Sequence, residues 1–599
     1  MFAPAKSRRQ ARQQISETRS LPAPVGGWNV RDSLALMKET EAAILDNWFP
    51  TTTDLQLRKG YINYSTGLSG TTETIVAYNA PSGTKKLFAF TSAGDLYDVT
   101  SPGAVGAAVI TGLTNGRWQY VAYGTAAGNF ILAVNGTDPM LRYNGTNWIS
   151  VLSTTTGVAL AVGGIVGNGT TATVSATGHK LQTGNTVTIT GCTLGSAAFN
   201  VGPVAITKTG ANTFTFASAY VGASTGAPVY TVSSGEVITG IDPATILTIN
   251  SFKQRIWLIP KNSLSAWYLS ASAISGAATE FPMSSFFIQG GQLQTMATWT
   301  IDVGIGIDDN AVFISSEGGV LVYKGTDPTS STTFALQGVF RMGNPIGTRC
   351  QIKYLGDVYA ITDQGVVPMS DAILTAQVTM KSDLTNKIQP AVATAIQAAR
   401  SSFGWQLIPL PSQNMLIVNA PGSPTVQFVM NTITGAWCRF TGWNASCWEA
   451  QGGNIYFGGT GIVAQAWSGT TDAGSSIVAD ALPAFNYFGN RGRIKSFKAA
   501  RPILLSDGSP SLTGVINVDY DTTAPTGALA YMPPSAGMVW GSMTWGSMVW
   551  GGSLSISKNW QYAGGVGYCG AFRFKAQNNG ANVRWEAIDY VLETGGVIA

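Results

Sequence analysis

The chain has 599 residues, of which 45% are hydrophobic and only 11% are charged, and its formal net charge is +4. The hydrophobic content excludes intrinsic disorder, and the small net charge is by itself no sign of nucleic-acid binding. Low charge, 71 glycines and 10% aromatic residues predict an all-β assembly protein of several domains with large contacts to other chains.

The first segment, residues 1–25, is a basic arm in which Glu17 is the only acid. Basic segments can contact phosphate backbones or acidic partners. The candidate contacts in the arm are Lys6, Arg8, Arg9 and Arg12. No apolar segment follows the arm, so we expect no secretory signal peptide. Shortly after it, Ser33–Asp46 predicts a short helix.

From residue 26 the chain repeats one unit, which is an apolar strand, a polar turn with Gly, Asn or Pro, and a second strand. Most units start 40–57 residues apart, close to the repeat length of a β-propeller blade. The pattern predicts a platform and first blades in 26–156 and further blades in 234–480. The hairpins are Leu87–Val99, Phe130–Tyr143, Ile256–Leu269, Val312–Tyr323, Val358–Met369, Met415–Met430 and Ile455–Trp467.

Two segments interrupt the repeat. Residues 157–233 alternate Thr and Val between tight Gly turns, which predicts a small peripheral β-sandwich or barrel. Residues 382–400 predict a helical insertion, with Ser382 as its N-cap. Pro390 should kink or restart this helix, because proline lacks the backbone N–H that a helix interior needs.

The last segment, residues 481–599, is a β module with two conspicuous features. The first is a basic cluster, a second candidate site for DNA or partner contacts. It comprises Arg491, Arg493, Lys495, Lys498 and Arg501. The second is WGSMTWGSMVWGG, in which Trp540, Trp545 and Trp550 are each followed by glycine. A five-residue step fits neither a helix face nor one face of a strand, so a kinked ribbon or loop is expected. Its indoles are candidates for a subunit interface or a distal tip, and burial in the chain's own core is the alternative.

Signals for catalysis and for metals are weak. Five cysteines, an odd number without C-x-x-C spacing, argue against a disulfide framework and against zinc. The single histidine, His179, lies beside Gly178 in a turn-like context, where a structural role is expected. The carboxylate pairs Asp308–Asp309 and Asp519–Asp521 have spacings that also occur in turn capping. We therefore expect no enzyme activity, no cofactor and no metal.

Several segments together resemble the tail nozzle proteins of short-tailed bacteriophages, also called tail tubular protein B or packaged-DNA stabilisation proteins. The N-terminal residues that carry the resemblance are Gly26–Gly27, Asp32, the run Asp46-Asn47-Trp48-Phe49-Pro50, Arg58 and Gly60–Tyr61. Residues 488–510 and 585–596 are also similar to that group. None of these motifs is catalytic, and their order along the chain is the main argument.

The resemblance implies a structural virion protein, made in the host cytoplasm and located in the tail. It implies a homo-hexameric ring below the portal-bound adaptor, with a central channel for viral double-stranded DNA. Tail fibres or spikes would be its neighbours, and its tip would meet the host surface and retain the genome until ejection. A nearly neutral channel suits this role, because tightly bound phosphates would slow ejection.

Two other functions remain open. One is a propeller lectin or fibre-like adhesin that binds host glycans through exposed aromatic residues. The other is a glycan-cleaving tail enzyme that uses Asp519 and Asp521, which would share a face if they lie in a strand.

Overall fold

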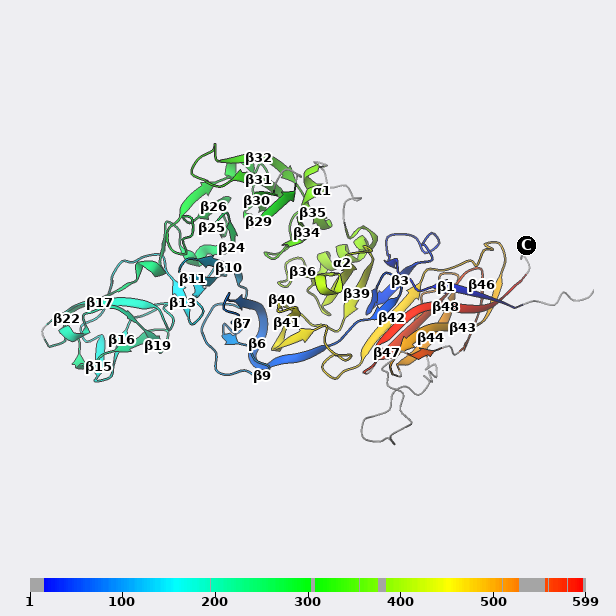
Figure 1. Ribbon diagram of the computed structural model, residues 1–599, viewed down its shortest axis with the longest axis horizontal. Helices are drawn as coiled ribbons and strands as arrows, with labels where there is room; N and C mark the ends of the chain where they lie inside the picture. The colour runs from blue at the N-terminus through cyan, green and yellow to red at the C-terminus, as the bar shows by residue number, and fades with distance from the viewer. Residues whose placement is uncertain are drawn as a thin grey trace, which may run out of the picture.

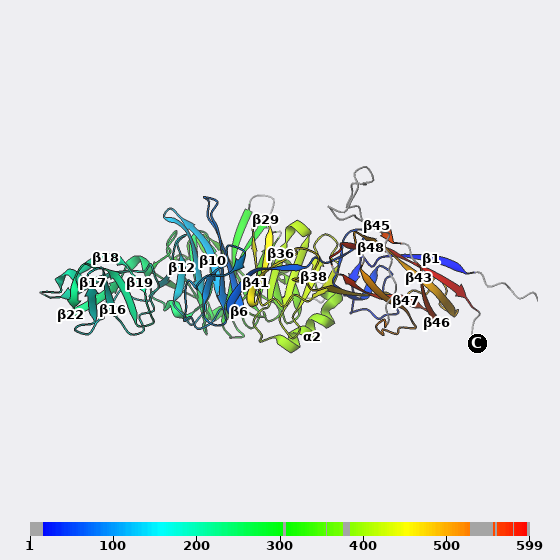
Figure 2. The same ribbon diagram turned by 90° about the horizontal axis from the view of Figure 1, so that it is seen from below.

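The computed structural model describes residues 16–193, 195–302, 307–354, 356–374, 384–508, 510–526, 555–557, 560–578 and 580–595. Within these residues the chain is almost entirely β, so the predicted all-β class is confirmed. Figures 1 and 2 show an elongated molecule with three parts in a row, namely a small sandwich, a ring of sheets and a second sandwich. In the described part of the chain, no helix is long and apolar enough to cross a membrane.

The central ring is a β-propeller with seven blades in the described residues, the number that the sequence left open. The innermost strands of consecutive blades contact one another and close a circle through β6, β10, β24, β29, β33, β36 and β40 (Figure 1). Blade 1 comprises the second half of β6 (Tyr61–Asn79) with β7 (Lys85–Thr91) and β8 (Leu96–Asp98). Blade 2 comprises β10 (Gln119–Thr125), β11 (Gly128–Val134), β12 (Met140–Tyr143) and β13 (Trp148–Val151). Blade 3 comprises β24 (Ile246–Phe252), β25 (Arg255–Pro260), β26 (Ser265–Tyr268) and β28 (Thr279–Pro282).

The remaining blades continue in chain order. Blade 4 comprises β29 (Leu293–Asp302), β30 (Ile307–Ser315), β31 (Gly319–Gly325) and β32 (Phe334–Arg341). Blade 5 comprises β33 (Gln351–Tyr354), β34 (Asp357–Thr362) and β35 (Gly365–Pro368). Blade 6 comprises β36 (Gln406–Leu410), β37 (Met415–Ala420), β38 (Val426–Asn431) and β39 (Trp437–Thr441). Blade 7 comprises β40 (Cys447–Gln451), β41 (Asn454–Ala466), the first half of β6 and β9 (Gly103–Ala104).

The strand β6 closes the ring because it belongs to two blades. Its first half pairs with β41, in the register Tyr61 to Ala466, and its second half pairs with β7. A strand from the start of the propeller thus completes the last blade, and closure protects the edges of the sheets. Each predicted hairpin supplies strands of a different blade. The prediction of a hairpin at Ile455–Trp467 was wrong, because these residues form the single strand β41. The glycine-rich middle of β41 forms a bulge beside Thr460.

The first sandwich is built from the inserted segment. One of its sheets comprises β14 (Val158–Ala159), β17 (Thr186–Cys192), β18 (Val201–Ala205) and β22 (Gly226–Val232). The other comprises β15 (Ile165–Asn168), β16 (Thr171–Ser175), β19 (Thr207–Lys208), β20 (Thr213–Ala217) and β21 (Val221–Ala223). The Thr/Val alternation buries every second residue of β16, and Phe199 and Phe214 lie in a hydrophobic core that belongs to this sandwich alone.

The second sandwich joins both ends of the chain. Sheet A comprises β1 (Glu17–Pro22), β4 (Trp48–Pro50), β5 (Leu55–Leu57), β43 (Lys495–Ser506), β45 (Ser555–Ser557), β46 (Gln561–Gly567) and β48 (Val583–Thr594). Sheet B comprises β2 (Gly27–Trp28), β3 (Glu41–Asp46), β42 (Ile477–Pro483), β44 (Ser511–Val518) and β47 (Gly570–Asn578), and it continues into blade 6 because β3 pairs with β39. Propeller and sandwich therefore share one sheet and one hydrophobic core.

The helices differ from the sequence prediction. The expected helix Ser33–Asp46 is wrong, since Glu41–Asp46 is strand β3 and turns precede it. β3 lies between β39 and β42 and buries Ala42 and Leu45, and this packing outweighs local propensity. In the second insertion, α2 spans Gln389–Ala399 after a 3-10 turn at Asn386–Ile388, and Pro390 lies in its first turn. A short helix α1 spans Met369–Leu374, and Ser382 lies outside the described residues.

The remaining short elements connect these parts. β23 (Ile238–Thr239) and β27 (Gly276–Ala277) form a two-stranded parallel pair. Further 3-10 turns lie at Ala197–Phe199, Ser234–Glu236, Pro243–Thr245, Ser284–Phe286 and Pro411–Gln413.

Candidate nucleic-acid and partner interfaces

The basic cluster on and before β43 is divided between two faces of sheet A. Lys495 points into the sandwich and is fully buried, and its Nζ donates to the carbonyl oxygens of Asn490, Arg493 and Tyr568 at 2.5, 2.9 and 2.8 Å. Burial lowers the pKa of this amine. The structure therefore places Lys495 where a nucleic acid cannot reach it.

Two other members of the cluster lie on the outer face of sheet A and are ion-paired. Lys498 Nζ lies 3.3 Å from Glu593, and Arg501 Nε lies 2.7 Å from Asp589. The guanidinium of Arg501 also stacks 4.5 Å from the ring centroid of Trp560. This face thus carries alternating charges that largely cancel, so it presents little net attraction to a polyanion.

The remaining two cations lie in the loop before β43 and are exposed. Arg491 donates to the carbonyl oxygen of Ala35 at 3.2 Å and stacks over Tyr487. Neither Arg491 nor Arg493 has an acidic partner within the described residues. These two arginines are the members of the cluster best placed for contact with phosphate. The arm residues Lys6, Arg8, Arg9 and Arg12 and the indoles Trp540, Trp545 and Trp550 lie outside the described residues, so their roles stay predictions.

The carboxylates that were candidates for catalysis make local structural contacts, Asp519 and Asp521 with backbone N–H groups and Asp309 with neighbouring side chains. Asp519 follows the end of β44 and has a positive φ of 49°, so it does not continue a strand with Asp521, and the shared-face argument was wrong. Asp519 Oδ1 accepts from the N–H of Tyr568 at 2.7 Å, and Asp521 Oδ1 accepts from the N–H of Thr523 at 3.0 Å. The Thr523 bonds lower the pKa of Asp521. Asp309 accepts from Thr300 and pairs with Lys253.

His179 is buried in the inserted sandwich, where it ties three backbone groups together. Its Nε2 lies 3.1 Å from the carbonyl oxygen of Gly210 and 3.3 Å from that of Thr213, and its Nδ1 accepts from the N–H of Leu181 at 3.0 Å. This geometry agrees with the structural role that its sequence context favoured. Within the described residues, no group of three or more His, Cys, Asp or Glu side chains is placed to hold a metal ion.

A polar cavity of about 240 Å³ lies on the propeller axis, lined by the innermost strands of all seven blades. The Tyr120 hydroxyl donates to Glu449 Oε2 at 2.5 Å, and Arg349 Nη2 donates to the carbonyl oxygen of Trp118 at 2.9 Å. Burial raises the pKa of Glu449 to about 7 and raises the pKa of Tyr120. This network could not be predicted from the sequence, because its members are far apart along the chain.

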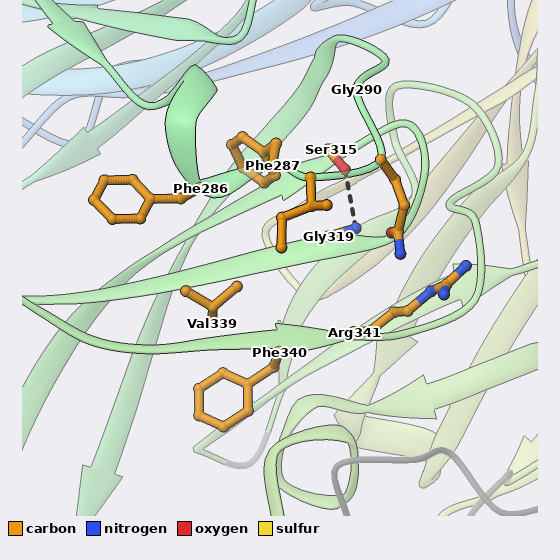
Figure 3. Close-up of a pocket in the computed structure, with 10 residues that line it drawn as sticks. Phe286, Phe287, Gly290, Ser315, Gly319, Val339, Phe340 and Arg341 are labelled. Atoms are coloured by element: carbon orange, nitrogen blue, oxygen red, sulfur yellow. Dashed lines mark hydrogen bonds between the residues drawn. The ribbon is translucent and has the colours of Figure 1, made fainter.

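An apolar groove of about 220 Å³ lies on blade 4 and was also missed (Figure 3). Phe286 and Phe287 form one wall, and Val339 and Phe340 of the outer strand β32 form the other (Figure 3). Ile288 is 94% exposed at its rim. Such a patch is typical of a contact surface.

The residues that carry the family resemblance form the junction between blade 6 and the second sandwich. Arg58, only 1% exposed, donates to Asn47 Oδ1 at 2.8 Å, to the carbonyl oxygen of Thr441 at 2.6 Å and to Asp472 at 2.5 and 2.8 Å. Asp46 forms a bidentate pair with Arg439 of β39, with both bonds at 2.7 Å.

Close packing at the junction explains other residues of the resemblance. A Cβ at Gly60 would lie 1.8 Å from the carbonyl oxygen of Thr471, so only glycine fits. Trp48 packs edge-on against Phe574 and Trp585 in the core of the sandwich. Among the residues of the resemblance, Asp46, Asn47 and Arg58 thus connect blade 6 to the second sandwich, while Trp48 packs inside that sandwich.

No family model and no curated protein matches this chain. Among solved structures, BBS1N in complex with ARL6DN, from a crystal soaked with lead, is 10% identical with a TM-score of 0.34, covering 69% of this chain and 99% of that one. The mercury-soaked crystal of the same complex is 9% identical with a TM-score of 0.35, covering 68% and 96%. The dihydro-heme d1 dehydrogenase NirN in complex with DHE is 10% identical with a TM-score of 0.30, covering 62% and 66%. Scores this low carry no argument about function.

Proposed function

We propose that this chain is a non-enzymatic structural protein of a short-tailed bacteriophage tail. In this proposal, six copies form the nozzle below the portal-bound adaptor. The ring conducts viral DNA, retains the genome until ejection and docks tail fibres or spikes.

The observation that carries the proposal is the junction. The motif Asp46-Asn47-Trp48-Phe49-Pro50 with Arg58 resembles nozzle proteins, and its polar side chains connect the propeller to the second sandwich. The nine-stranded sheet B runs through the same place without interruption. A stiff connection of this kind suits a part that must keep its shape while DNA is packed above it.

The outer face of sheet A supports the proposed conduit. Lys498 and Arg501 are paired with Glu593 and Asp589, so DNA passing this face would meet few unpaired cations. Each unpaired cation that contacts a phosphate adds a salt-dependent attraction, which would retard movement of the duplex.

Electron microscopy of the purified chain, alone and mixed with its portal–adaptor complex, tests the proposal. The expected result is a six-fold tapered ring with a central hole, docked on the adaptor. A chain that stays monomeric and ignores the adaptor would overturn the proposal. Binding of that monomer to host glycans would then support an adhesin.

A further inference from the structure

Sheet A has two open edges at its two sides. β48 and β43 form its centre, β1 lies beyond β48, and β46 lies beyond β43. Within the described residues, no strand pairs with the outer side of β1 or with the outer side of β46. Open edges carry unpaired N–H and C=O groups that readily pair with another chain. β44 of sheet B packs against β46 without pairing with it, so ladder groups on both edges are free for a strand of another chain.

The two open edges have similar lengths and lie at the same end of sheet A. β1 has 6 residues and β46 has 7. Arg19 of β1 pairs with Tyr590 of β48. Ala500 of β43 pairs on one side with Tyr590 and on the other with Gln561 of β46, so both edges lie at the same end of the sheet.

All three pairings in this row are antiparallel, so β1 and β46 run in opposite directions. When two copies stand side by side in the same orientation, β46 of one copy and β1 of the next are antiparallel strands. That arrangement permits regular ladder hydrogen bonds. The edges are offset by a few residues along the strands, and closing a sheet into a barrel requires such a stagger.

The side chains at the β46 edge favour a partner over solvent. Tyr562 is 84% exposed and Val566 is 61% exposed on the outer face. Ile556 of β45 and Trp560 lie exposed beside them. Native edge strands usually carry charges or prolines that discourage pairing. β46 reads QYAGGVG and has neither, whereas β1 reads ETRSLP and has both, so β46 is the less protected of the two edges.

We propose that β46 of one copy pairs with β1 of the next copy, head to tail, so that sheet A becomes continuous around the ring. This inference rests on the proposed function, because it names the interface of the proposed ring. Head-to-tail contacts between different surfaces give closed rings. In each copy, sheet B covers the inner face of sheet A and leads into the propeller. Sheet B and the propeller must therefore lie outside the closed barrel that the six copies of sheet A would form.

The outer face of sheet A then lines the channel. Each copy supplies the four-strand row β1, β48, β43 and β46, so six copies give a barrel of about 24 strands, wider than the 16–18-stranded porins that leave an aqueous channel. Its wall would carry the ion pairs Lys498–Glu593 and Arg501–Asp589. The same interface thus explains both the open edges and the neutralised charges.

Charge substitutions at the two edges test the interface. In the full chain, Tyr562→Lys with Val566→Lys makes β46 cationic, and Thr18→Lys with Ser20→Lys makes the outer face of β1 cationic. Either pair of changes should weaken assembly about 100-fold or more, as the loss of central contacts does in other interfaces. Light scattering and electron microscopy measure assembly, and unchanged circular dichroism verifies folding. Val162→Lys with Val221→Lys, at two exposed apolar positions of the inserted sandwich, is the matched control and should assemble normally.

Mixing and charge reversal make the test specific. A chain blocked at β46 mixed with a chain blocked at β1 should form dimers and no rings, because one complementary pair of edges remains. Combining the lysines at β46 with Thr18→Glu and Ser20→Glu in one chain should restore rings. Rings that survive both edge blocks would overturn this interface and leave the proposed function standing. Dimerisation by the chain blocked only at β1, without mixing, would mean that β46 pairs with itself and would also overturn it. A wild-type chain that never assembles would overturn both proposals.

Discussion

At the scale of single residues, the decisive positions are buried polar groups that join parts of the chain distant in sequence. Arg58 binds groups from three segments, at Asn47, Thr441 and Asp472, and it also stacks over Trp443. A buried charge of this kind is stable only while all its partners remain, since desolvation has already removed its water.

Replacing Arg58 with alanine should therefore destabilise the chain strongly. We expect a loss of about 3–5 kcal/mol, because Asp472 would be left without its partner in a largely buried site. Arg19→Ala is the matched control, since the pair Arg19–Glu17 is exposed and should contribute less than about 1 kcal/mol. Thermal and urea unfolding measure both variants, and equal small losses would contradict the role given to the junction.

Glu449 should make the stability of the propeller depend on pH. Its pKa rises from 4.5 to about 7 on folding, so its contribution is fully present below pH 4.5 and is lost as pH rises through 7. Glu449→Gln should match the wild type at pH 4 and exceed it at pH 8 by at most about 3 kcal/mol. Unfolding curves at a series of pH values measure this difference.

Tyr120→Phe separates this titration from a general loss of packing. The Tyr120 hydroxyl donates to the Glu449 carboxylate and lowers the pKa of that carboxyl, so its removal should move the transition to higher pH. Parallel pH profiles for the wild type and Glu449→Gln would show that Glu449 does not titrate in this range.

At the scale of elements, the inserted sandwich has its own core and should unfold by itself. Phe199 is fully buried there, and Phe199→Ala should cost about 3–5 kcal/mol within this unit. Calorimetry should show one transition moving to lower temperature while the others stay in place. Trp257→Ala, in the core of blades 3 and 4, should instead move the propeller transition. A single transition that moves in both variants would mean that the units are coupled.

The sequence predicted the strands well where a local period governs them. The hairpins and the Thr/Val alternation of β16 depend on neighbours a few residues apart, and they appear at the predicted places except for Ile455–Trp467, which is the single strand β41. The number of blades could not be predicted from the sequence, because in blade 7 β6 pairs with β41, which lies about 400 residues further along the chain. The prediction of a helix at Ser33–Asp46 was wrong for a similar reason, because pairing with the distant strands β39 and β42 holds residues 41–46 in a strand.

The cations of the basic cluster could be predicted from the sequence, but the directions in which their side chains point could not. The cluster of five cations was visible, but a bulge in β43 between Phe497 and Ala499 and the packing of Phe497 decide which side chains face outward. Lys495 is consequently buried while Lys498 meets Glu593. The axial network could not be found from sequence, because Tyr120, Arg349 and Glu449 meet only when the ring closes.

At the scale of the whole molecule, unpaired rather than total charge should govern contact with DNA. Replacing Arg491 and Arg493 together with alanine should lower the slope of log K against log salt for duplex DNA by about two. Lys180→Ala, at an exposed site on the inserted sandwich, should leave the slope unchanged. Fluorescence anisotropy with a labelled duplex measures both. An unchanged slope in the double variant would exclude the loop from DNA contact.

The double membership of β6 also has a consequence for synthesis of the chain. Tyr61 leaves the ribosome early, but its partner Ala466 follows about 20–80 s later at ordinary elongation rates. Sheet A is delayed further, because β1 waits for β48 at the far end of the chain. Neither the propeller nor the second sandwich can be completed in a chain whose translation stops early. A truncated chain therefore lacks both the closed propeller and the two edges of sheet A through which the proposed ring would assemble.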